Sequence, residues 1–590
     1  MNRRDALIAG LLALSLAVLL LPFARQGIDP HHDGIMLKPA LDVLSGQVLF
    51  RDTFSQYGAL TTYLQTAALW FQPTLLSLRL QTVAAYAVTL FFLYAAWRMI
   101  LPRSLAIVSC ALFILFIPAY EKNWLDQYWM LLPWSSVYAM MFQSVGLYAL
   151  FRVIRSEQPV AWGAILGAAC AGVFWCRQPV GILMTACVAV IWLALWWTNW
   201  APTNQSRRSV LAGIGGGFGA VHVCLLGGIL FSGAGPEWWY QNFIWPRKMV
   251  SLNVNLGLHD FLTVFVHPRA GLGLLLLFGA AAAPRLANRF WPGLPGRAIT
   301  GYYFFLGAVL LWQYPWMLHT LALRDGGWTA LLPVVIILQG VVSLVSVFPA
   351  RAGPRTSEYY LVASLAALSL GSLLQYYPLP DSWHILWSLG PAFGLAVYVF
   401  WRGLGWPAHV LALVLTASFL PSVYAKALSA RECLNRPMVQ LTAPAVLRGM
   451  KVPPEQAKSF GRIADALAPI LRHRPDLPAA LIGNDTLFLC FALNRANPTP
   501  YYVTWPNLAD NTDNLKRWSY IQSVRPLMFL HKAQWDAVGD FYRRNRYVPL
   551  LYLPEEALEI AVPQELADAM GLTAYGAAPG GEATKQTSKP

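Results

Sequence analysis

Long apolar runs separated by short polar connections follow one another from the N-terminus to about residue 425. Most of them approach the roughly 20 residues that an α-helix needs to cross the hydrocarbon core of a bilayer. The pattern predicts about thirteen membrane-spanning helices in a transmembrane module over residues 1–425. The expected spans are 6–23, 78–97, 104–118, 134–151, 159–175, 180–198, 209–232, 262–283, 300–318, 328–348, 359–374, 385–401 and 406–424.

The pattern changes after residue 425, where charged residues become frequent and apolar runs become short. A helical stretch at 455–471 alternates with β-like runs at 479–482, 527–530 and 548–553. We therefore expect a small α/β domain over 426–575, which is long enough to bury its own core. The polar, glycine-rich and proline-containing residues 576–590 are typical of a disordered tail.

The arginines indicate how the chain is oriented. Alternate connections between the expected spans are short and contain arginine, whereas the opposite connections are longer and rich in tryptophan and tyrosine. Cytosolic loops carry such an excess of cations, and aromatic residues favour the membrane surface. We expect a multi-pass membrane protein. Its N-terminus lies in the cytosol and, with an odd number of spans, its C-terminal domain is extracytoplasmic.

Composition excludes several classes of protein. The chain is 57% hydrophobic and only 12% charged, with a mean hydropathy of +0.46, which a single soluble core would not need. The formal net charge of +15 does not indicate nucleic acid, because the cations lie in short clusters between apolar runs. The seven cysteines show no metal-ligand spacing. Two of them, Cys433 and Cys490, lie in the polar tail, where a disulfide is one alternative.

The first expected outside loop, residues 25–77, concentrates acidic side chains. It reads DPHHDGIMLKPALDVLSGQVLFRDTFSQY from position 29 and contains Asp29, Asp33, Asp42 and Asp52. Carboxylates next to a bilayer are costly unless they face water or a partner, so such a segment is a candidate functional site. The following run, 58–71, is too short to span and has one polar face, as an interfacial helix would.

This arrangement resembles a known family. A short cytosolic start, one span, an acidic outside loop and the phrase RDTFSQYG before an interfacial helix are similar to the glycosyltransferase C (GT-C) fold. The bacterial protein O-mannosyltransferases and aminoarabinose transferases are the most similar members, and CRQPVG at 176–181 and DSWH at 381–384 add to the likeness. The resemblance implies a polyprenyl-phosphate sugar donor, a first-loop aspartate that acts as general base or orients the acceptor, and an extracytoplasmic C-terminal domain. It also implies that the protein lies in the bacterial cytoplasmic (inner) membrane.

Transfer of a sugar from a lipid phosphate to a hydroxyl needs a carboxylate that can reach the acceptor proton. We expect Asp33 to be this general base, with Asp29 as the second candidate. The reaction is expected to be a direct displacement that inverts the configuration at the anomeric carbon. The alternative is that either aspartate only caps the helix that starts near Ile35, because aspartate is a preferred cap. Asp42 and Asp52 are expected to be structural, with Arg51 as their partner.

The leaving phosphate needs cations or hydrogen-bond donors on the same side of the membrane. The candidates near the outer boundary are Arg324, Arg177, Arg247, Lys248 and His384. The alternative is that Arg247 and Lys248 contact lipid headgroups and that Arg324 pairs with Asp325.

Metal binding and other functions remain open alternatives. His31, His32 and Asp33 are candidate ligands of a divalent metal, although adjacent histidines without a third, well-spaced ligand are a weak signal. A transporter or lipid-linked sugar flippase would place polar groups near the midplane of two related halves. A non-enzymatic assembly factor would not need ionisable groups gathered in one loop. The sequence favours the transferase, acting on a glycan, lipid or protein acceptor.

Overall fold

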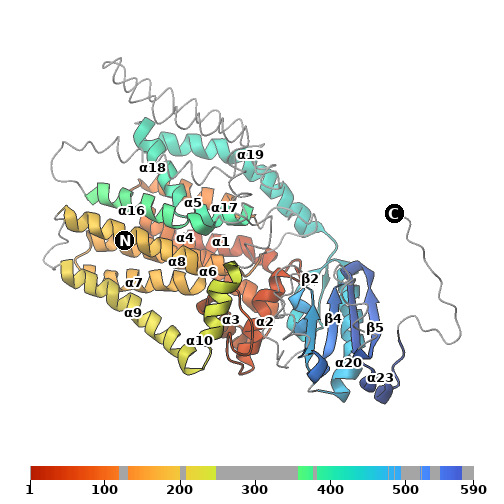
Figure 1. Cartoon of the computed structure of the whole chain (residues 1–590). Helices are drawn as coiled ribbons and strands as arrows, with labels where there is room; N and C mark the ends of the chain where they lie inside the picture. Colours follow the sequence, from red (N-terminus) through yellow and green to blue (C-terminus); the bar gives the residue numbers. More distant parts are fainter. Residues whose placement is uncertain are drawn as a thin grey trace, which may run out of the picture.

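The structure is a computed structural model, and it describes residues 2–118, 131–198, 207–247, 357–375, 382–404, 406–475, 477–483, 485–492, 519, 521–531 and 545–574. A bundle of long helices carries a small β-sheet domain at one end, beside helices α2 (His32–Leu44) and α3 (Ala59–Phe71) (Figure 1). The chain is thus a polytopic α-helical protein with a C-terminal α/β domain, as predicted from the sequence.

Within the described residues, seven helices are long and apolar enough to cross a membrane. They are α1 (Arg3–Ala24), α4 (Leu75–Trp97), α6 (Ser135–Arg155), α7 (Pro159–Cys176), α8 (Gln178–Trp197), α9 (Arg207–Phe231) and α16 (Ser357–Gly371) with the short η5 (Leu373–Gln375). Each coincides with an expected span. The expected 104–118 span is the shorter α5 (Arg103–Leu115). Those at 262–283, 300–318 and 328–348 lie outside the described residues, so the total of about thirteen stays a prediction.

The last two expected spans differ from the prediction. Residues 385–401 do not form one helix, because α17 (Ser382–Leu389) ends before Gly390-Pro391 and α18 (Ala392–Leu404) begins after it. Proline has no N–H to continue a helical ladder, and glycine favours turns. Helix α19 (Ala408–Asn435) bends by 40° next to Pro421 and continues past the expected domain boundary at 426.

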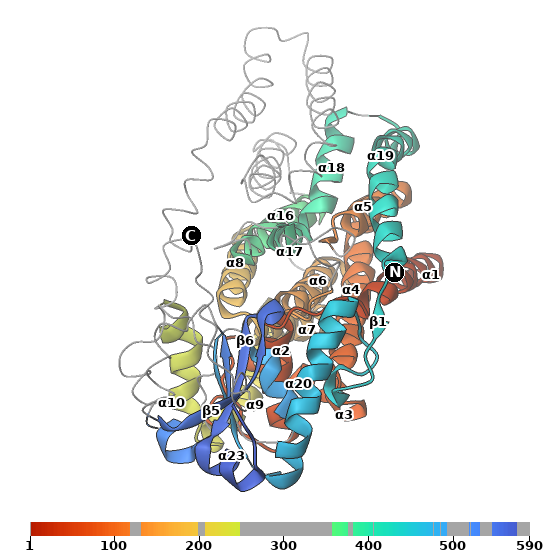
Figure 2. The same cartoon turned by 90° about the vertical axis from the view of Figure 1, so that its right-hand side faces the viewer.

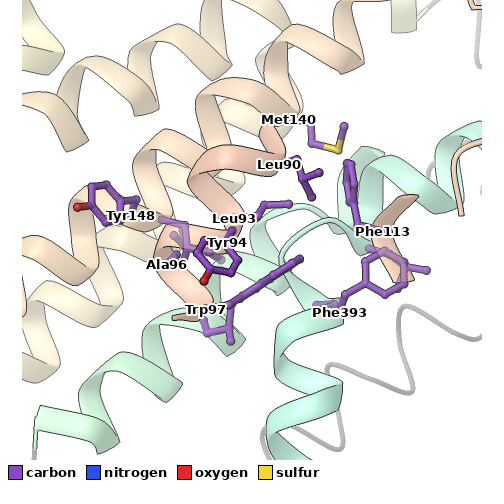
Figure 3. Packing of buried hydrophobic residues seen from close by; sticks show 14 of the residues in the cluster. Leu90, Leu93, Tyr94, Ala96, Trp97, Phe113, Met140, Tyr148 and Phe393 are labelled. Carbon is purple, nitrogen blue, oxygen red and sulfur yellow. The ribbon is translucent and has the colours of Figure 1, made fainter. Parts of the chain in front are cut away.

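Aromatic side chains pack α18 against α4 and α5 (Figure 3). The rings of Phe113 and Phe393 meet edge to face, with 6.4 Å between their centroids. Trp97 is fully buried and donates its indole N–H to the carbonyl of Pro391 at 3.3 Å. A side chain at Gly394 would overlap the Trp97 ring, so glycine allows this close approach. The broken span is therefore held tightly to the bundle.

The C-terminal domain is a four-stranded sheet in the order β3 (Ala479–Ile482), β4 (Leu527–His531), β6 (Leu558–Pro563), β5 (Tyr547–Leu553). β3 and β4 are parallel and the other neighbours antiparallel. The amphipathic α20 (Pro454–His473) lies along the sheet (Figure 2), and α23 (Gln564–Met570) follows β6. The predicted helix and three strands are confirmed. β6 was not predicted, nor was the ribbon of β1 (Val439–Gln440) and β2 (Lys451–Val452).

The domain shares a hydrophobic core with the first loop. Ile35 and Leu37 of α2 belong to the same buried cluster as Leu487 of η7 (Thr486–Ala492). The Leu487 N–H donates to the carbonyl of Pro30 at 3.0 Å. The domain is therefore packed directly on the acidic loop that the sequence singles out.

Gly34 makes this close packing testable. A Cβ at Gly34 would overlap the backbone of Leu487, whereas one at Gly461 on α20 would meet nothing within 4 Å. We expect Gly34→Ala to destabilise the protein by about 1–3 kcal/mol through overpacking. Gly461→Ala is the matched control and should be neutral or slightly stabilising. Thermal unfolding in detergent measures both, and equal melting temperatures would contradict this packing.

The possible disulfide of the tail is wrong, since Cys433 and Cys490 are both free and buried. Cys433 lies on α19, where its thiol donates to Gln26 Oε1 at 2.8 Å. Cys490 lies in η7, 4.0 Å from the carbonyl of Thr486. Each sulfur thus contributes to the packing of its own element.

Candidate functional site

Asp29 forms a carboxylate–imidazole pair at the start of α2. Its Oδ1 accepts the backbone N–H groups of His31 and His32, both at 2.9 Å. Its Oδ2 lies 2.7 Å from Nδ1 of His32. Asp29 therefore accepts the first N–H groups of α2, whose N-cap residue is His31, and at the same time fixes the orientation of an imidazole ring.

The charge of Asp29 follows from these contacts. Burial raises the pKa of this carboxyl, but the imidazoles of His32 and His31 and the hydrogen bonds from His32 outweigh burial and bring the pKa below its ordinary value. An ionised carboxylate only accepts hydrogen bonds, so Nδ1 of His32 carries the proton. In the neutral ring Nε2 is then the basic nitrogen.

Asp33 occupies a different environment. Its side chain is 0% exposed and forms an ion pair with Arg79 of α4, with 2.5 Å between Oδ2 and Nη2. Oδ2 also accepts the Asp29 N–H at 2.9 Å, and Arg79 donates to the carbonyl of Gln26 at 2.7 Å. Burial raises the pKa of Asp33, opposed by Arg79. Asp33 thus joins the loop to α4, whereas Asp29 is joined to His32.

An aromatic wall extends from the Asp29–His32 pair. The indole of Trp134 lies with its centroid 5.0 Å from the His32 ring and 5.7 Å from the ring of His384 on α17. His384 in turn lies 5.0 Å from Trp387. The buried Nε1 of Trp134 has no hydrogen-bond partner among the residues that the structure describes. Buried donors usually have a partner, so this N–H is available to a polar ligand.

Arg177 lies farther along the same side of the bundle, between α7 and α8. Its guanidinium donates to Ser136 Oγ, at the start of α6 and two residues after Trp134. Burial raises the pKa of Tyr57, and the charge of Arg177 opposes the rise. The half-buried Arg177 is therefore close to the end of the RDTFSQY segment. Arg177 and His384 are candidates that the sequence suggested, whereas Trp134 was not among them.

Of the other phosphate candidates, Arg247 lies within the described residues. Arg247 is exposed and lies just after the π-helix η2 (Tyr240–Ile244). Lys248 and Arg324 lie outside the described residues.

Gln241 of the π-helix η2 hydrogen-bonds the backbone on both sides of the RDTF sequence in the first loop. Gln241 donates to the carbonyl of Phe50 at 2.8 Å and accepts the N–H of Ser55 at 3.0 Å. Phe50 has a positive φ of 70°, which is uncommon for a bulky residue. The short helix α10 (Gly235–Trp239) leads into this π-helix. Such π-helical turns are frequent at functional sites.

The structural aspartates of the loop differ in their partners. Asp52 pairs with Arg51 at 2.9 Å, as expected. Asp42 instead pairs with the buried Lys38 and accepts the Thr53 hydroxyl at 2.7 Å. The expected link from Asp42 to Arg51 is therefore wrong, because Lys38 lies one helical turn before Asp42 on α2.

The C-terminal domain brings further ionisable groups to the loop. Oδ2 of Asp485 lies 3.5 Å from Nε2 of His531. Burial, with a contribution from Asp29, raises the pKa of Asp485 to about 6. Burial and Asp485 raise the pKa of Glu556 to about 7. Sequence reasoning predicted none of these three residues.

The raised pKa of Asp485 predicts a pH dependence. A carboxyl that holds its proton more tightly in the folded state stabilises the protein at low pH and loses this contribution as pH rises. For Asp485 the loss falls between the ordinary value of 3.8 and about 6. Asp29, His32, His531 and Glu556 surround this group and are unchanged in the Asp485→Asn variant. The melting temperature of wild type minus that of Asp485→Asn, measured across this pH range, gives the contribution of Asp485 to stability, and this difference should fall as pH rises. A difference that rises with pH would contradict the assignment.

The candidate metal ligands do not assemble. His32 is bound to Asp29, and Asp33 is bound to Arg79. Across the described ranges, no group of three or more His, Cys, Asp or Glu side chains is arranged to hold a metal ion.

Comparisons with known proteins give structural neighbours only. No family model matches the sequence, and no curated protein matches it. The oligosaccharyltransferase of Archaeoglobus fulgidus in complex with Zn and sulfate matches with a TM-score of 0.49 and 11% identity over 95% of this chain and 73% of that one. AglB from the same organism, with an inhibitory peptide and a dolichol-phosphate, matches with 0.46 and 12% over 95% and 74%.

ArnT from Cupriavidus metallidurans, bound to undecaprenyl phosphate, matches with a TM-score of 0.45 and 14% identity over 94% of this chain and 97% of that one. At such identities the likeness concerns the fold alone. The three TM-scores are below 0.5, so these proteins are structural neighbours of the chain and no more.

Proposed function

We propose that this chain is a membrane glycosyltransferase that moves a sugar from a polyprenyl-phosphate donor to an acceptor hydroxyl on the extracytoplasmic side. The observation that carries the proposal is the pair of the buried Asp29 and the half-buried His32, with 2.7 Å between Oδ2 and Nδ1. An ionised carboxylate that orients an imidazole is a common form of general base. The Asp29–His32 pair lies in the first loop, which also contains RDTFSQYG and on which the GT-C resemblance rests.

In the proposed reaction, Nε2 of His32 takes the proton of the acceptor hydroxyl as its oxygen attacks the anomeric carbon. The bond from that carbon to the phosphate oxygen breaks, and the lipid phosphate leaves with the electron pair. Asp29 stays ionised and stabilises the imidazolium. Direct displacement inverts the anomeric centre. Asp33, the base expected from the sequence, acts in this proposal through Arg79, by holding the loop in place.

The donor phosphate is proposed to bind Arg177, whose guanidinium donates to Ser136, and His384, whose ring lies beside Trp134. A guanidinium suits a phosphate because its fork donates two parallel hydrogen bonds. Lys248 and Arg324 remain candidates for the same role. The donor carries a hexosyl or pentosyl group on a polyprenyl phosphate, the lipid class to which dolichol phosphate and undecaprenyl phosphate belong.

The proposal is tested with purified protein in detergent and a panel of radiolabelled polyprenyl-phosphate sugars, with and without a chelator. Wild type should release the label from one donor, either to an acceptor or slowly to water. Loss of release with chelator would show a divalent metal requirement. No release from any donor would speak against the transferase.

Arg177 supplies the second test. We expect Arg177→Ala to raise the KM for the donor by about 10- to 100-fold, because a charge-assisted phosphate contact is lost. Arg247→Ala is the matched control, since Arg247 is exposed in the part of the chain that the structure describes. Steady-state kinetics with the active donor measure both. Equal KM values for the two variants would remove Arg177 from the phosphate site.

A further inference from the structure

Three ionisable residues of the C-terminal domain meet at one edge of its sheet. Asp485 follows β3, and His531 ends β4, the strand parallel to it. Leu558 at the start of β6 pairs with His531, so the turn that holds Glu556 reaches the same edge. Carboxyl ends of neighbouring parallel strands are where α/β sheets commonly bind ligands.

This edge faces the proposed catalytic pair. Two residues after Asp485, Leu487 donates its N–H to Pro30, which directly follows Asp29. The charges of Asp29 and His32 both act on Asp485. The sheet edge and the start of α2 therefore lie together, with the domain packed on the loop through Leu487.

Asp485 and His531 are more exposed to solvent than the buried ion pair of Asp33 and Arg79. Their side chains are 20% and 27% exposed, whereas those of Asp33 and Arg79 are 0% exposed. Their 3.5 Å separation is long for a hydrogen bond, so both groups retain capacity to hydrogen-bond a ligand. Gly483 has a φ of 152°, and a Cβ there would lie 2.7 Å from Cβ of His531. Glycine thus allows His531 to lie at this edge.

We propose that Asp485 and His531 position the hydroxyl group of the acceptor beside His32, so that the C-terminal domain completes the active site. This inference rests on the proposed function. Asp485 accepts a hydrogen bond from an acceptor hydroxyl adjacent to the reacting one. His531 hydrogen-bonds a neighbouring polar atom of the acceptor. Both are positioning residues, since the proton of the reacting hydroxyl goes to His32. The acceptor class is a polyhydroxylated compound with adjacent hydroxyl groups.

Glycerol serves as a small acceptor probe with adjacent hydroxyls. With the donor that wild type consumes, the sugar is partitioned between water and glycerol at fixed concentration, and the ratio of glycosyl-glycerol to free sugar is measured. Asp485→Asn and His531→Gln should lower this ratio by about tenfold, the effect of losing one hydrogen bond to a charged group.

Asp465→Asn is the matched control, an exposed aspartate on α20 of the same domain, and it should leave the ratio unchanged. A ratio that stays at the wild-type value in both variants overturns the inference. A wild-type ratio of glycosyl-glycerol to free sugar that is equal to or lower than the ratio of either variant also overturns it. Wild type that consumes no donor would instead count against the proposed function itself. Because the ratio does not depend on the amount of folded protein, partial unfolding cannot imitate the expected result.

Discussion

Replacing Asp29 by Asn lowers transfer by about 100- to 10,000-fold, the range expected when general base catalysis is lost. Asparagine retains an oxygen that accepts the N–H groups of His31 and His32, so the cap of α2 is preserved. Its amide nitrogen, however, would donate to Nδ1 of His32. The ring is then held in the wrong tautomer, with its proton on Nε2, and cannot take a proton from the acceptor.

Release of label from the active donor measures this loss, with the melting temperature as a check on folding. Asp52→Asn is the matched control, because Asp52 lies in the same loop and pairs with Arg51. We expect near wild-type activity for it. If Asp29→Asn were active while a folded Asp33→Asn was inactive, the base would be Asp33.

Arg79→Ala is the change with the largest expected effect on stability. It leaves the carboxylate of Asp33 buried without its cation, which typically costs about 3–5 kcal/mol. It also removes the hydrogen bond to the carbonyl of Gln26. Since these groups join α4 to the first loop, we expect a large fall in melting temperature and loss of activity.

The double variant Asp33→Leu/Arg79→Met separates the charge from the packing. Replacing both members of a buried ion pair by apolar residues is often tolerated, so this variant should be more stable than Arg79→Ala. Arg51→Ala, which breaks an exposed pair, should leave unfolding unchanged. Thermal unfolding in detergent compares the three. A melting temperature of Arg79→Ala equal to that of Arg51→Ala would contradict a structural role for the buried pair.

The sequence predicted those parts of the fold that follow from local periodicity. The apolar runs predicted the seven described spans, and short β-like runs predicted three of the four strands of the sheet. The break at Pro391 was missed, although glycine and proline at 390–391 are a local signal for it. The strand β6 was missed because its register depends on β4 and β5, which precede it in the chain.

The candidate site was predicted in its location but not in its internal arrangement. Spacing along α2 cannot rank Asp29 against Asp33, because the difference lies in Arg79, which is 46 residues from Asp33. Arg79 did carry a signal, as it is the one charged residue in the expected 78–97 span. The pairing of Asp485 with His531 had no such signal in the sequence, since it depends on the parallel pairing of β3 with β4.

The most direct test follows the sugar in vesicles that contain the purified protein and a labelled polyprenyl-phosphate sugar on which wild type is active. Glycosyl transfer predicts that label leaves the lipid with wild type and stays on the lipid with Asp29→Asn. Label that crosses the membrane while still attached to its lipid, equally with wild type and Asp29→Asn, would identify a flippase and contradict the transferase.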